Sequence, residues 1–435
     1  MEKINSIVKN LGNTKELSKL IDKYLIPQEL EKKKNAEVST PYILRNEMLD
    51  LVTKYGDPEF WTKPKKVFEP CSGKGGFLVD ILTRFMEGLK GFEPDEKKRY
   101  KLIVEDCIYF SDINATNIYI NKLLLDPYGE YKLNYNQGNT LELDIKEKWR
   151  IEKGFDLVVG NPPYNSSGRV ATGNTIWQHF TKLSIQKWCK DQGFLLFVHP
   201  CGWRKPNTLK GKFYGLYDLM SIQNQILYLD INDTKQGLKM FKCGTRYDFY
   251  ILQRKKCYKE TIVSNEDKEI EKIRMDEMNW LPNKNIDYVR NKILTKDNNE
   301  KCPIMYCRTS YGADKKWISK EKNEIYKYPC IHSTPTKNIV YRYSKYNDKG
   351  QFGVSKVIFG ATGIKRVVID TKGEYGMTQG AMGIKVDSVE EANVISSALL
   401  SDRFQKFVKS CMFSHYSLDW NIFKDFKKDF WKEFI

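Results

Sequence analysis

Residues 155–164 read FDLVVGNPPY, and the interpretation of the chain starts from this stretch. The apolar run is rich in β-branched residues, which is typical of a buried parallel strand. It ends at a glycine followed by two prolines, which cannot donate the hydrogen bonds of a strand ladder. We therefore predict a stiff loop at the carboxyl end of a strand, where open α/β sheets bind their ligands.

This loop offers hydrogen-bond acceptors and an aromatic ring. The side-chain oxygen of Asn161 and a carbonyl of Pro162 can accept hydrogen bonds from a planar amino group, while the ring of Tyr164 stacks on the heterocycle that carries it. Such a site stabilises positive charge that develops on the amine. The loop has no acid, cysteine or serine nucleophile.

The composition favours a large intracellular protein with a polyanionic partner. A chain of 435 residues is long enough for two domains, and its net charge of +17 makes nucleic acid the first candidate, although a general lysine enrichment would give a similar excess. The ten cysteines form no C-x-x-C pair and there are only four histidines, which argues against zinc and for a reducing compartment. Without a signal sequence or an apolar run of 18 residues, we expect a cytoplasmic protein and no membrane partner.

A second motif, VFEPCSGKGGF at residues 67–77, predicts a short strand, a glycine-rich turn and a helix that begins near Gly76. Glycines let the backbone approach a ligand, and a helix N-terminus presents free N–H groups. The spacing fits neither a G-x-G-x-x-G fingerprint nor a P-loop. Glu69 before Pro70 is typical of an S-adenosylmethionine site, because an acid there complements the methionine ammonium.

Two further strand-like segments end in polar residues. Asp112 follows residues 102–109 and could accept hydrogen bonds from ribose hydroxyls or cap the helix that starts at Asn114, and the two roles are compatible. Asn139 ends a third segment and can accept through its side-chain oxygen. His199, at the end of a later strand, is assigned a structural role.

Residues 1–36 have helical spacing and predict two short helices that pack on the main domain as a lid or collar. Residues 40–52 predict a helix with Thr40 as its cap and Pro41 at its first position. The small polar residues of 165–174 predict a mobile lid over the substrate.

Taken in order, these motifs resemble those of the gamma-class N6-adenine DNA methyltransferases, which use S-adenosylmethionine. The landmarks are the Thr-Pro of 40–41, EPCSGKGGF of 69–77, SDI of 111–113, GNTL of 138–141, NPPY of 161–164 and Phe241 before a strand from residue 247. The resemblance covers somewhat over half of the chain. It departs from the family pattern at Asn139, where an aspartate is usual.

The resemblance implies an α/β fold, with a Rossmann-like methyltransferase sheet that has helices on both faces and a mixed α+β target-recognition domain after it. The expected division is an N-terminal helical segment (1–36), a catalytic domain (37–255) and a recognition domain (256–435). In the last of these, residues 352–369 and 377–386 predict short strands, and residues 390–409 predict a helix.

The resemblance also implies the site residues. Those expected to hold S-adenosylmethionine are Thr40, Glu69, Pro70, Cys71, Gly73, Phe77, Asp112, Ile113, Asn139 and Asn161. Those expected to carry catalysis are Asn161, Pro162, Pro163 and Tyr164. A flipped adenine would stack between Tyr164 and Phe241, with Tyr247 in reserve for Phe241. Methyl transfer would be direct, with neither a protein-bound intermediate nor a metal.

Basic residues alternate with aromatic ones in the second half of the chain, a pattern that suits phosphate contacts and base stacking, although a solvated surface carries similar charges. The DNA-binding candidates are Arg308, Lys315, Lys316, Arg342 and Lys345. We therefore expect a DNA adenine methyltransferase of a restriction-modification system, with double-stranded DNA as partner and a separately encoded restriction endonuclease left open. The alternatives are the same chemistry on RNA or on a protein glutamine, and a catalytically idle DNA-binding protein with this fold.

Overall fold

The structure, a computed structural model, describes residues 14–25, 27, 38–166, 174–206, 211–413 and 418–435. They fall into two compact units, residues 1–203 with 208–279 and residues 204–207 with 280–435. No helix in the described ranges is long and apolar enough to cross a membrane.

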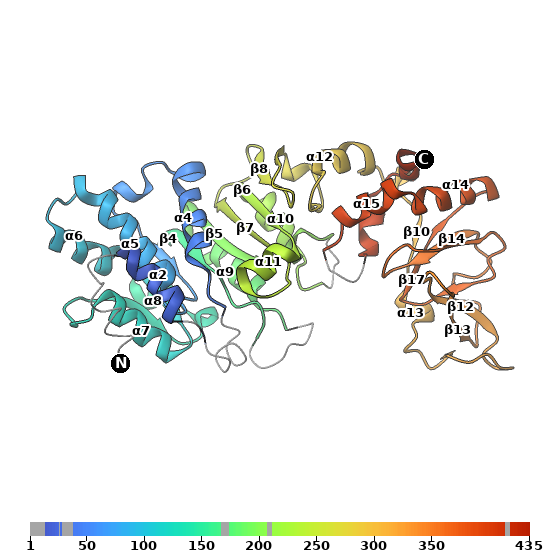
Figure 1. Ribbon diagram of the computed structural model, residues 1–435, viewed down its shortest axis with the longest axis horizontal. Helices are drawn as coiled ribbons and strands as arrows, with labels where there is room; N and C mark the ends of the chain where they lie inside the picture. Colours follow the sequence, from blue (N-terminus) through green and yellow to red (C-terminus); the bar gives the residue numbers. More distant parts are fainter. Residues whose placement is uncertain (1–13, 26, 28–37, 167–173, 207–210, 414–417) are drawn as a thin grey trace. The chain divides into compact units, whose positions relative to one another are not determined.

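The first unit contains one large mixed sheet (Figure 1). Its strands are β1 (Val67–Glu69), β2 (Ile108–Asp112), β3 (Asn134–Gln137), β4 (Phe155–Gly160), β5 (Cys189–Pro200), β6 (Gln225–Asn232), β7 (Tyr247–Gln253), β8 (Thr261–Ser264) and β9 (Ile270–Ile273). Within the described residues the order is β3-β2-β1-β4-β5-β7-β6-β8-β9. The neighbours from β3 to β5 are parallel, whereas β7 is antiparallel to both β5 and β6.

The strand order reverses between β1 and β4. The chain moves from β1 outward to β2 and β3, then returns to the other side of β1 with β4 and continues to β5. At such a reversal, the loops that follow the two central strands separate and open a crevice at their carboxyl ends. The two motifs with the clearest chemistry, after β1 and after β4, both lie at this edge.

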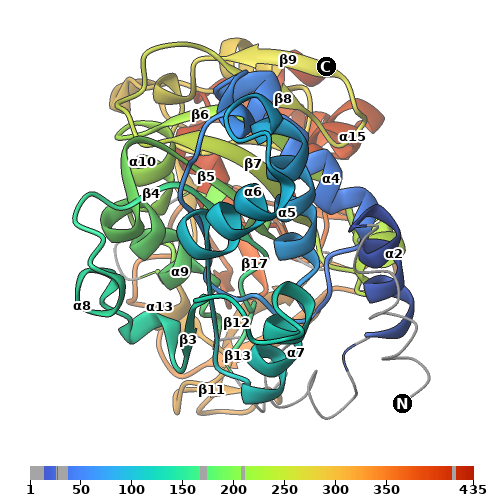
Figure 2. The same cartoon turned by 90° about the vertical axis from the view of Figure 1, so that its left-hand side faces the viewer.

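Helices cover both faces of this sheet, as predicted. They are α2 (Thr14–Tyr24), α4 (Tyr42–Leu51), α5 (Gly76–Gly88), α6 (Glu96–Leu102), α7 (Ala115–Leu125), α8 (Ile145–Trp149), α9 (Trp177–Leu183), α10 (Leu216–Ser221) and α11 (Thr234–Phe241). On one face, Val67 of β1 shares a core cluster with Leu44 of α4 and Ile81 of α5, and Figure 2 shows α4, α5 and α6 side by side there. On the other face, Phe68 stacks on Phe155 with ring centroids 4.8 Å apart.

The predicted helix start at Gly76 is confirmed, but two other boundaries differ from expectation. The segment 102–109 is not a strand throughout, because α6 runs to Leu102, a wide turn covers 103–107 and β2 begins only at Ile108. Ile103, Val104 and Cys107 of that turn are buried, whereas Glu105 and Asp106 are not. Helix α4 begins at Tyr42, with Pro41 rather than Thr40 in the cap position.

The predicted N-terminal helices are described in part. Helix α2 lies within 1–36 and packs Leu17 and Ile21 against Val79 of α5 and Leu124 of α7. Residues 1–13 and 28–37 lie outside the described residues, as do residues 167–173 of the predicted lid.

The second unit is a mixed α+β structure, as predicted, and the described residues form two four-stranded sheets. The orders are β10-β17-β14-β15 and β11-β13-β12-β16. The strands are β10 (Ile304–Met305), β11 (Ile318–Ser319), β12 (Tyr328–Ser333), β13 (Val340–Ser344), β14 (Lys356–Gly360), β15 (Val367–Asp370), β16 (Gly376–Met377) and β17 (Ala381–Lys385). The helices are α12 (Ile286–Tyr288), α13 (Arg308–Tyr311), α14 (Val389–Leu400) and α15 (Asp402–Ser410).

Two features of the second half differ from the expected division. Strands β8 and β9 extend the sheet of the first unit, so its compact region continues past residue 255 to residue 279. The single helix expected over 390–409 is two helices, because Ser401 adopts an extended backbone (ψ 146°) and its side chain caps α15.

Candidate cofactor and substrate site

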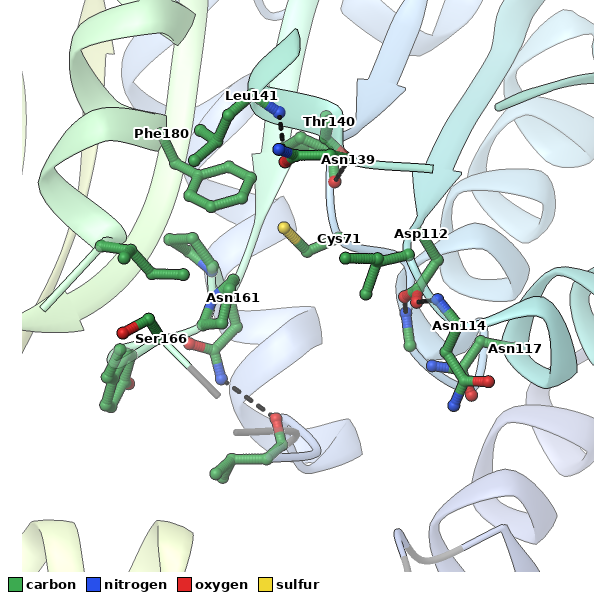
Figure 3. Close-up of a pocket in the computed structure, with 18 of the residues that line it drawn as sticks. Cys71, Asp112, Asn114, Asn117, Asn139, Thr140, Leu141, Asn161, Ser166 and Phe180 are labelled. Carbon is green, nitrogen blue, oxygen red and sulfur yellow. Dashed lines mark hydrogen bonds between the residues drawn. The ribbon is translucent and has the colours of Figure 1, made fainter. Parts of the chain in front are cut away.

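A cavity of about 700 Å³ lies at the carboxyl ends of β1, β2 and β4 (Figure 3). Its walls come from the loops after these strands, from residues 139–141 and from the region around α9. The predicted site residues that line it are Pro70, Cys71, Gly73, Asp112, Ile113, Asn139, Asn161, Pro162, Pro163 and Tyr164. The fold thus brings motifs from four separate segments around one space.

A smaller hollow of about 50 Å³ adjoins this cavity and shares Cys71, Gly73 and Asn161 with it. The remaining predicted cofactor residues, Thr40, Glu69 and Phe77, line this hollow. Every predicted cofactor residue therefore lies in one of the two connected spaces.

Glu69 is the last residue of β1 and is only 2% exposed. Its Oε2 is buried and has no hydrogen-bond partner among the described residues. Burial raises the pKa of this carboxyl well above its usual range, the charge of Arg45 opposes the rise, and the negative charge of Asp112 adds to it. A buried acid with an unpaired oxygen is costly unless a ligand completes its hydrogen bonds, and a cationic group would do so best.

Asp112 joins the glycine-rich turn to the end of β2. Its Oδ2 accepts a hydrogen bond from the Gly73 N–H at 2.8 Å, and its Oδ1 accepts one from the Asn114 N–H at 2.8 Å. The cap of α7 is the side chain of Asn114, which accepts from the N–H of Thr116. Burial raises the pKa of Asp112, and its carboxylate lines the cavity beside Asn114. Of the two roles considered, helix capping belongs to Asn114, which leaves Asp112 for the turn and the cavity.

Asn161 holds its carboxamide in one orientation. Its Nδ2 donates to the carbonyl oxygen of Val38 at 3.3 Å, as the dashed line in Figure 3 shows. Its Oδ1 is buried and has no hydrogen-bond partner among the described residues. The free atom of this side chain is therefore an acceptor, which is the atom needed to hold an amino group.

Tyr164 lines the cavity, and burial raises the pKa of its phenol, with Tyr247 and Cys243 as the next contributions. Its hydroxyl has no hydrogen-bond partner in the described part of the chain. Phe241, the predicted second stacking residue, ends α11 and meets the ring of Tyr247 edge to face at 4.9 Å. It is not among the described residues that line the cavity, so its stacking role stays a prediction.

Sequence reasoning missed several apolar residues of the cavity wall, among them Phe180 of α9, Leu141 and Val38. Figure 3 shows Phe180 and Leu141 close to Asn139. An apolar residue in an amphipathic helix carries no sign of whether it faces a core or a cavity. Only the packing of α9 over the loop after β3 shows that Phe180 and Leu141 line the cavity.

Asn139 is held by its near neighbours along the chain. Its Oδ1 accepts from the N–H of Leu141 at 3.2 Å, and its Nδ2 donates to Oε1 of Glu142 at 2.7 Å. The second contact fixes which end of the amide is the acceptor. An acceptor can thus face the cavity here although the expected aspartate is missing.

The sequence also led to expectations about His199 and about metal binding. His199 is buried against Trp177, with ring centroids 4.2 Å apart, and burial lowers the pKa of its imidazole to about 3. Its Nε2 lies 3.0 Å from the hydroxyl of Tyr250, so these contacts give it a structural role. No group of three His, Cys, Asp or Glu in the described residues could hold a metal ion.

The DNA-binding candidates of the second unit lie in or next to α13, β11 and β13. The Lys345 N–H donates to the Trp317 carbonyl at 3.0 Å, and the Lys345 ammonium lies 5.0 Å from the ring centre of Tyr326. Lys349 lies over Trp317 at 4.9 Å. Arg342 lies in β13, Lys315 and Lys316 precede β11, and Arg308 begins α13. We call this group, from residue 308 to residue 349, the basic–aromatic surface.

Comparison with known proteins places the sequence match in the first unit. Residues 97–229 match the family described as Eco57I restriction-modification methylase. This segment contains β2, β4 and the Asn-Pro-Pro-Tyr loop. No curated protein matches the chain in sequence.

Solved structures match over much more of the chain. The type IIL restriction-modification enzyme MmeI in complex with DNA is 11% identical, has a TM-score of 0.53, and is matched over 95% of this chain and 70% of its own. The type ISP restriction-modification enzyme LlaGI, a nuclease-deletion mutant with a DNA substrate mimic, is 12% identical with a TM-score of 0.52, over 92% of this chain and 54% of its own. A chain of a type I restriction-modification system is 18% identical with a TM-score of 0.43, over 58% of this chain. The present chain spans 50% of that last protein.

At such low identity, the matches to MmeI and LlaGI show the fold alone. The family match covers residues 97–229, which is less than half of the chain.

Proposed function

We propose that the protein is a site-specific DNA methyltransferase that transfers a methyl group from S-adenosylmethionine to N6 of an adenine flipped out of duplex DNA. The observation that carries this proposal is the buried, unpaired Oδ1 of Asn161 at the edge of a cavity of about 700 Å³. An amide oxygen in that position lacks the proton donor that an exocyclic amine would supply.

The polar groups present fit S-adenosylmethionine, which would supply the methyl group when bound. The unpaired oxygen of Glu69 suits the amino group of the methionine part, and the carboxylate of Asp112 suits the ribose hydroxyls. The oriented oxygen of Asn139 suits the adenine amine, while Ile113 and Phe180 offer apolar surface to the ring. This set assigns an acceptor or an apolar face to the amino group, the ribose and the adenine of the cofactor.

The substrate side rests on the Asn-Pro-Pro-Tyr loop. Asn161 Oδ1 and the Pro162 carbonyl accept the two N–H groups of the target amine, and the Tyr164 ring stacks on its base. As N6 gains the methyl group it becomes positively charged, and then it loses a proton to solvent. Acceptors that are already oriented in a buried site stabilise this charge without reorganising.

Sequence reading is assigned to the second unit. A base must leave the duplex before it can enter a buried pocket, so the enzyme needs a surface that holds the surrounding DNA. The basic–aromatic surface supplies ammonium and guanidinium groups for phosphates next to rings for stacking. The net charge of +17 supports the same partner. The role in a restriction-modification system is proposed from the matched family.

The test is transfer of labelled methyl from S-adenosylmethionine to mixed duplex DNA, with RNA and cell protein in parallel. After digestion to nucleosides, label in N6-methyladenine from DNA is the expected result. Label only in RNA or in protein glutamine would keep the chemistry but overturn the substrate. Cofactor binding without any transfer would favour a DNA-binding protein that has lost its activity.

A further inference from the structure

Arg45 joins three segments of the first unit at one buried point. Its Nε donates to Asp80 of α5 at 2.6 Å, and its Nη2 donates to Ser18 of α2 at 2.7 Å. Its Nη1 donates to Asp22 of α2 at 2.7 Å and to the Thr40 carbonyl at 2.5 Å. The side chain is almost fully buried, and a guanidinium with so many satisfied donors holds its neighbours in a fixed geometry.

The helix α2 completes this arrangement from its side. Asp22 Oδ2 accepts from the N–H of Tyr42 at 2.5 Å, so an acid of α2 satisfies the first free N–H of α4, where Pro41 offers no side-chain cap. Ser18 donates to Asp80 at 2.5 Å. The polar residues of α2 therefore bind the beginning of α4 and Asp80 of α5 at the same time.

The arrangement reaches the glycine-rich turn through Gly76, the first residue of α5. A Cβ at this position would lie 2.7 Å from the guanidinium of Arg45, a distance that no side chain could keep. The glycine is therefore needed for Arg45 to lie against the start of α5. A shift of Arg45 would act directly on the turn that carries Gly73 and Gly75.

The same residues line the hollow that contains Glu69. Ile21 and Asp22 of α2 form one side of it, with Thr40 and Arg45 beside them. The charge of Arg45 also opposes the rise in the pKa of Glu69. Helix α2 thus closes the part of the site to which the amino end of the cofactor is assigned.

We propose that Arg45 is a positioning residue that fixes α2 as a wall of the cofactor site, so that cofactor binding and α2 docking are coupled. The proposal rests on the proposed function, since it concerns the same cavity. Coupling of this kind is reciprocal, so bound cofactor stabilises the docked helix and a loosened helix weakens the cofactor.

The test uses the full chain with Asp22→Asn, which keeps the shape of the side chain but removes its charge. Titration calorimetry with S-adenosylmethionine is expected to show about tenfold weaker binding, equivalent to about 1.4 kcal/mol. Affinity for duplex DNA is expected to stay unchanged. In the wild type, S-adenosylmethionine is expected to slow hydrogen exchange in residues 14–24, and this protection is expected to be smaller in the variant.

Arg84→Gln is the matched control. Arg84 also joins α4 to α5, through Asp50 at 2.6 Å and Asn46 at 2.9 Å, but it lines neither the cavity nor the hollow. Its loss is expected to leave cofactor affinity as it is. If Asp22→Asn fails to fold, Ser18→Ala removes the hydroxyl that donates to Asp80 and accepts from Arg45, and it is expected to weaken cofactor binding by about fivefold.

The outcomes separate the two proposals. Wild-type protein that binds no S-adenosylmethionine would overturn the proposed function. Wild-type protein that binds it, with equal affinity in the α2 variant and unchanged hydrogen exchange in residues 14–24, would overturn the role of Arg45 alone. If Arg84→Gln weakened S-adenosylmethionine binding as much as the α2 variant does, the effect would come from the general stability of the α4–α5 pair. That result would also overturn the proposal.

Discussion

Two buried carboxylates, Glu69 of the first unit and Asp370 of the second, have opposite surroundings. Each ends a strand and is 2% exposed. Asp370 accepts hydrogen bonds from Lys356 Nζ at 2.6 Å and from the N–H groups of Glu374 and Tyr375 at 2.8 and 3.1 Å. Glu69 leaves its Oε2 without a partner in the described part of the chain. Burial alone therefore does not mark a functional acid, whereas burial with an unmet hydrogen bond does.

The partner of Asp370 is satisfied as well. The Lys356 ammonium also donates to the carbonyls of Gln351 and Val354 at 3.0 and 3.1 Å. Burial lowers the pKa of Lys356, and the hydrogen bond and charge of Asp370 oppose that change. This pair needs nothing from outside, and we assign it to the stability of the second unit.

Breaking the self-sufficient pair is expected to have the largest effect on stability. Lys356→Met leaves Asp370 buried without its counter-charge, which typically costs about 3–5 kcal/mol of unfolding free energy. Thermal and urea denaturation would measure the loss. The double variant Lys356→Met/Asp370→Leu is expected to recover part of it, because neither charge is then left buried. If Lys356→Met were as stable as the wild type, the Lys356–Asp370 pair would have no role in the stability of the second unit.

Asn161→Ala is expected to give the largest effect on catalysis. Loss of one oriented hydrogen-bond group that stabilises charge in a transition state typically costs about 100-fold to 1,000-fold in kcat. Cofactor affinity is expected to fall much less than kcat, since the acceptors assigned to the cofactor at Glu69, Asp112 and Asn139 remain. Single-turnover methyl transfer together with cofactor titration would separate the two quantities. Equal loss of both would contradict the role given to Asn161.

Glu69→Gln sharpens the comparison from the other side. Because an unpaired buried carboxylate stabilises nothing in the fold, its neutral replacement is expected to keep or raise the melting temperature. The affinity for S-adenosylmethionine is expected to fall by about tenfold to 100-fold, the range of a lost charge-assisted hydrogen bond. A variant that melts earlier yet binds the cofactor normally would show that Glu69 belongs with Asp370 as a structural acid.

The same acid predicts how cofactor binding depends on pH. Burial raises the pKa of Glu69, so a proton on this carboxyl competes with the cofactor ammonium for the same oxygen. The affinity for S-adenosylmethionine is expected to rise as the pH rises toward that raised pKa. At pH values below it, binding is expected to be weaker and to release a proton. The stability of the free protein is expected to change in the opposite direction. Its free energy of unfolding falls as the pH rises through the folded pKa of Glu69, because the buried carboxyl then becomes charged. Calorimetry in buffers of different ionisation enthalpy measures the released proton, and Glu69→Gln is expected to abolish it.

The smallest effect is expected at Asn139. Asn139→Asp would restore the residue that the family usually has, but its carboxylate would then face Glu142, which now accepts a hydrogen bond at 2.7 Å. We expect cofactor affinity to fall by a few-fold, about 1 kcal/mol or less, because both groups are exposed. Asn139→Asp/Glu142→Gln is expected to restore it. A single variant that binds more tightly than the wild type would show that Glu142 does not orient this position.

Local sequence patterns predicted the central part of the site because each motif carries its own geometry. The apolar run before Gly160 and the prolines after it predict a strand end, and the glycine turn predicts the helix that starts at Gly76. The order of these elements then places them at one edge of a parallel sheet. Ten of the predicted residues consequently line one cavity.

What sequence alone did not predict depends on contacts between distant segments. Asp22 looks like any charged residue of an amphipathic helix until α2 docks and its carboxylate meets the N–H of Tyr42. The roles of Phe180 and of the free oxygen of Asn161 could not be predicted for the same reason, since a cavity wall and an unmet hydrogen bond exist only after packing. The strand expected over 102–109 was wrong because Ile103, Val104 and Cys107 are apolar and buried in a turn, and sequence alone does not distinguish them from strand residues.

The most direct test of the central claim is an experimental structure of the protein with S-adenosylmethionine bound. We predict that the amino group lies within hydrogen-bond distance of Glu69 Oε2 and that the methyl group faces Asn161. The ribose hydroxyls are expected at Asp112. A cofactor bound elsewhere, or one in this cavity with its amino group away from Glu69, would contradict the claim that the unpaired buried oxygens mark the site.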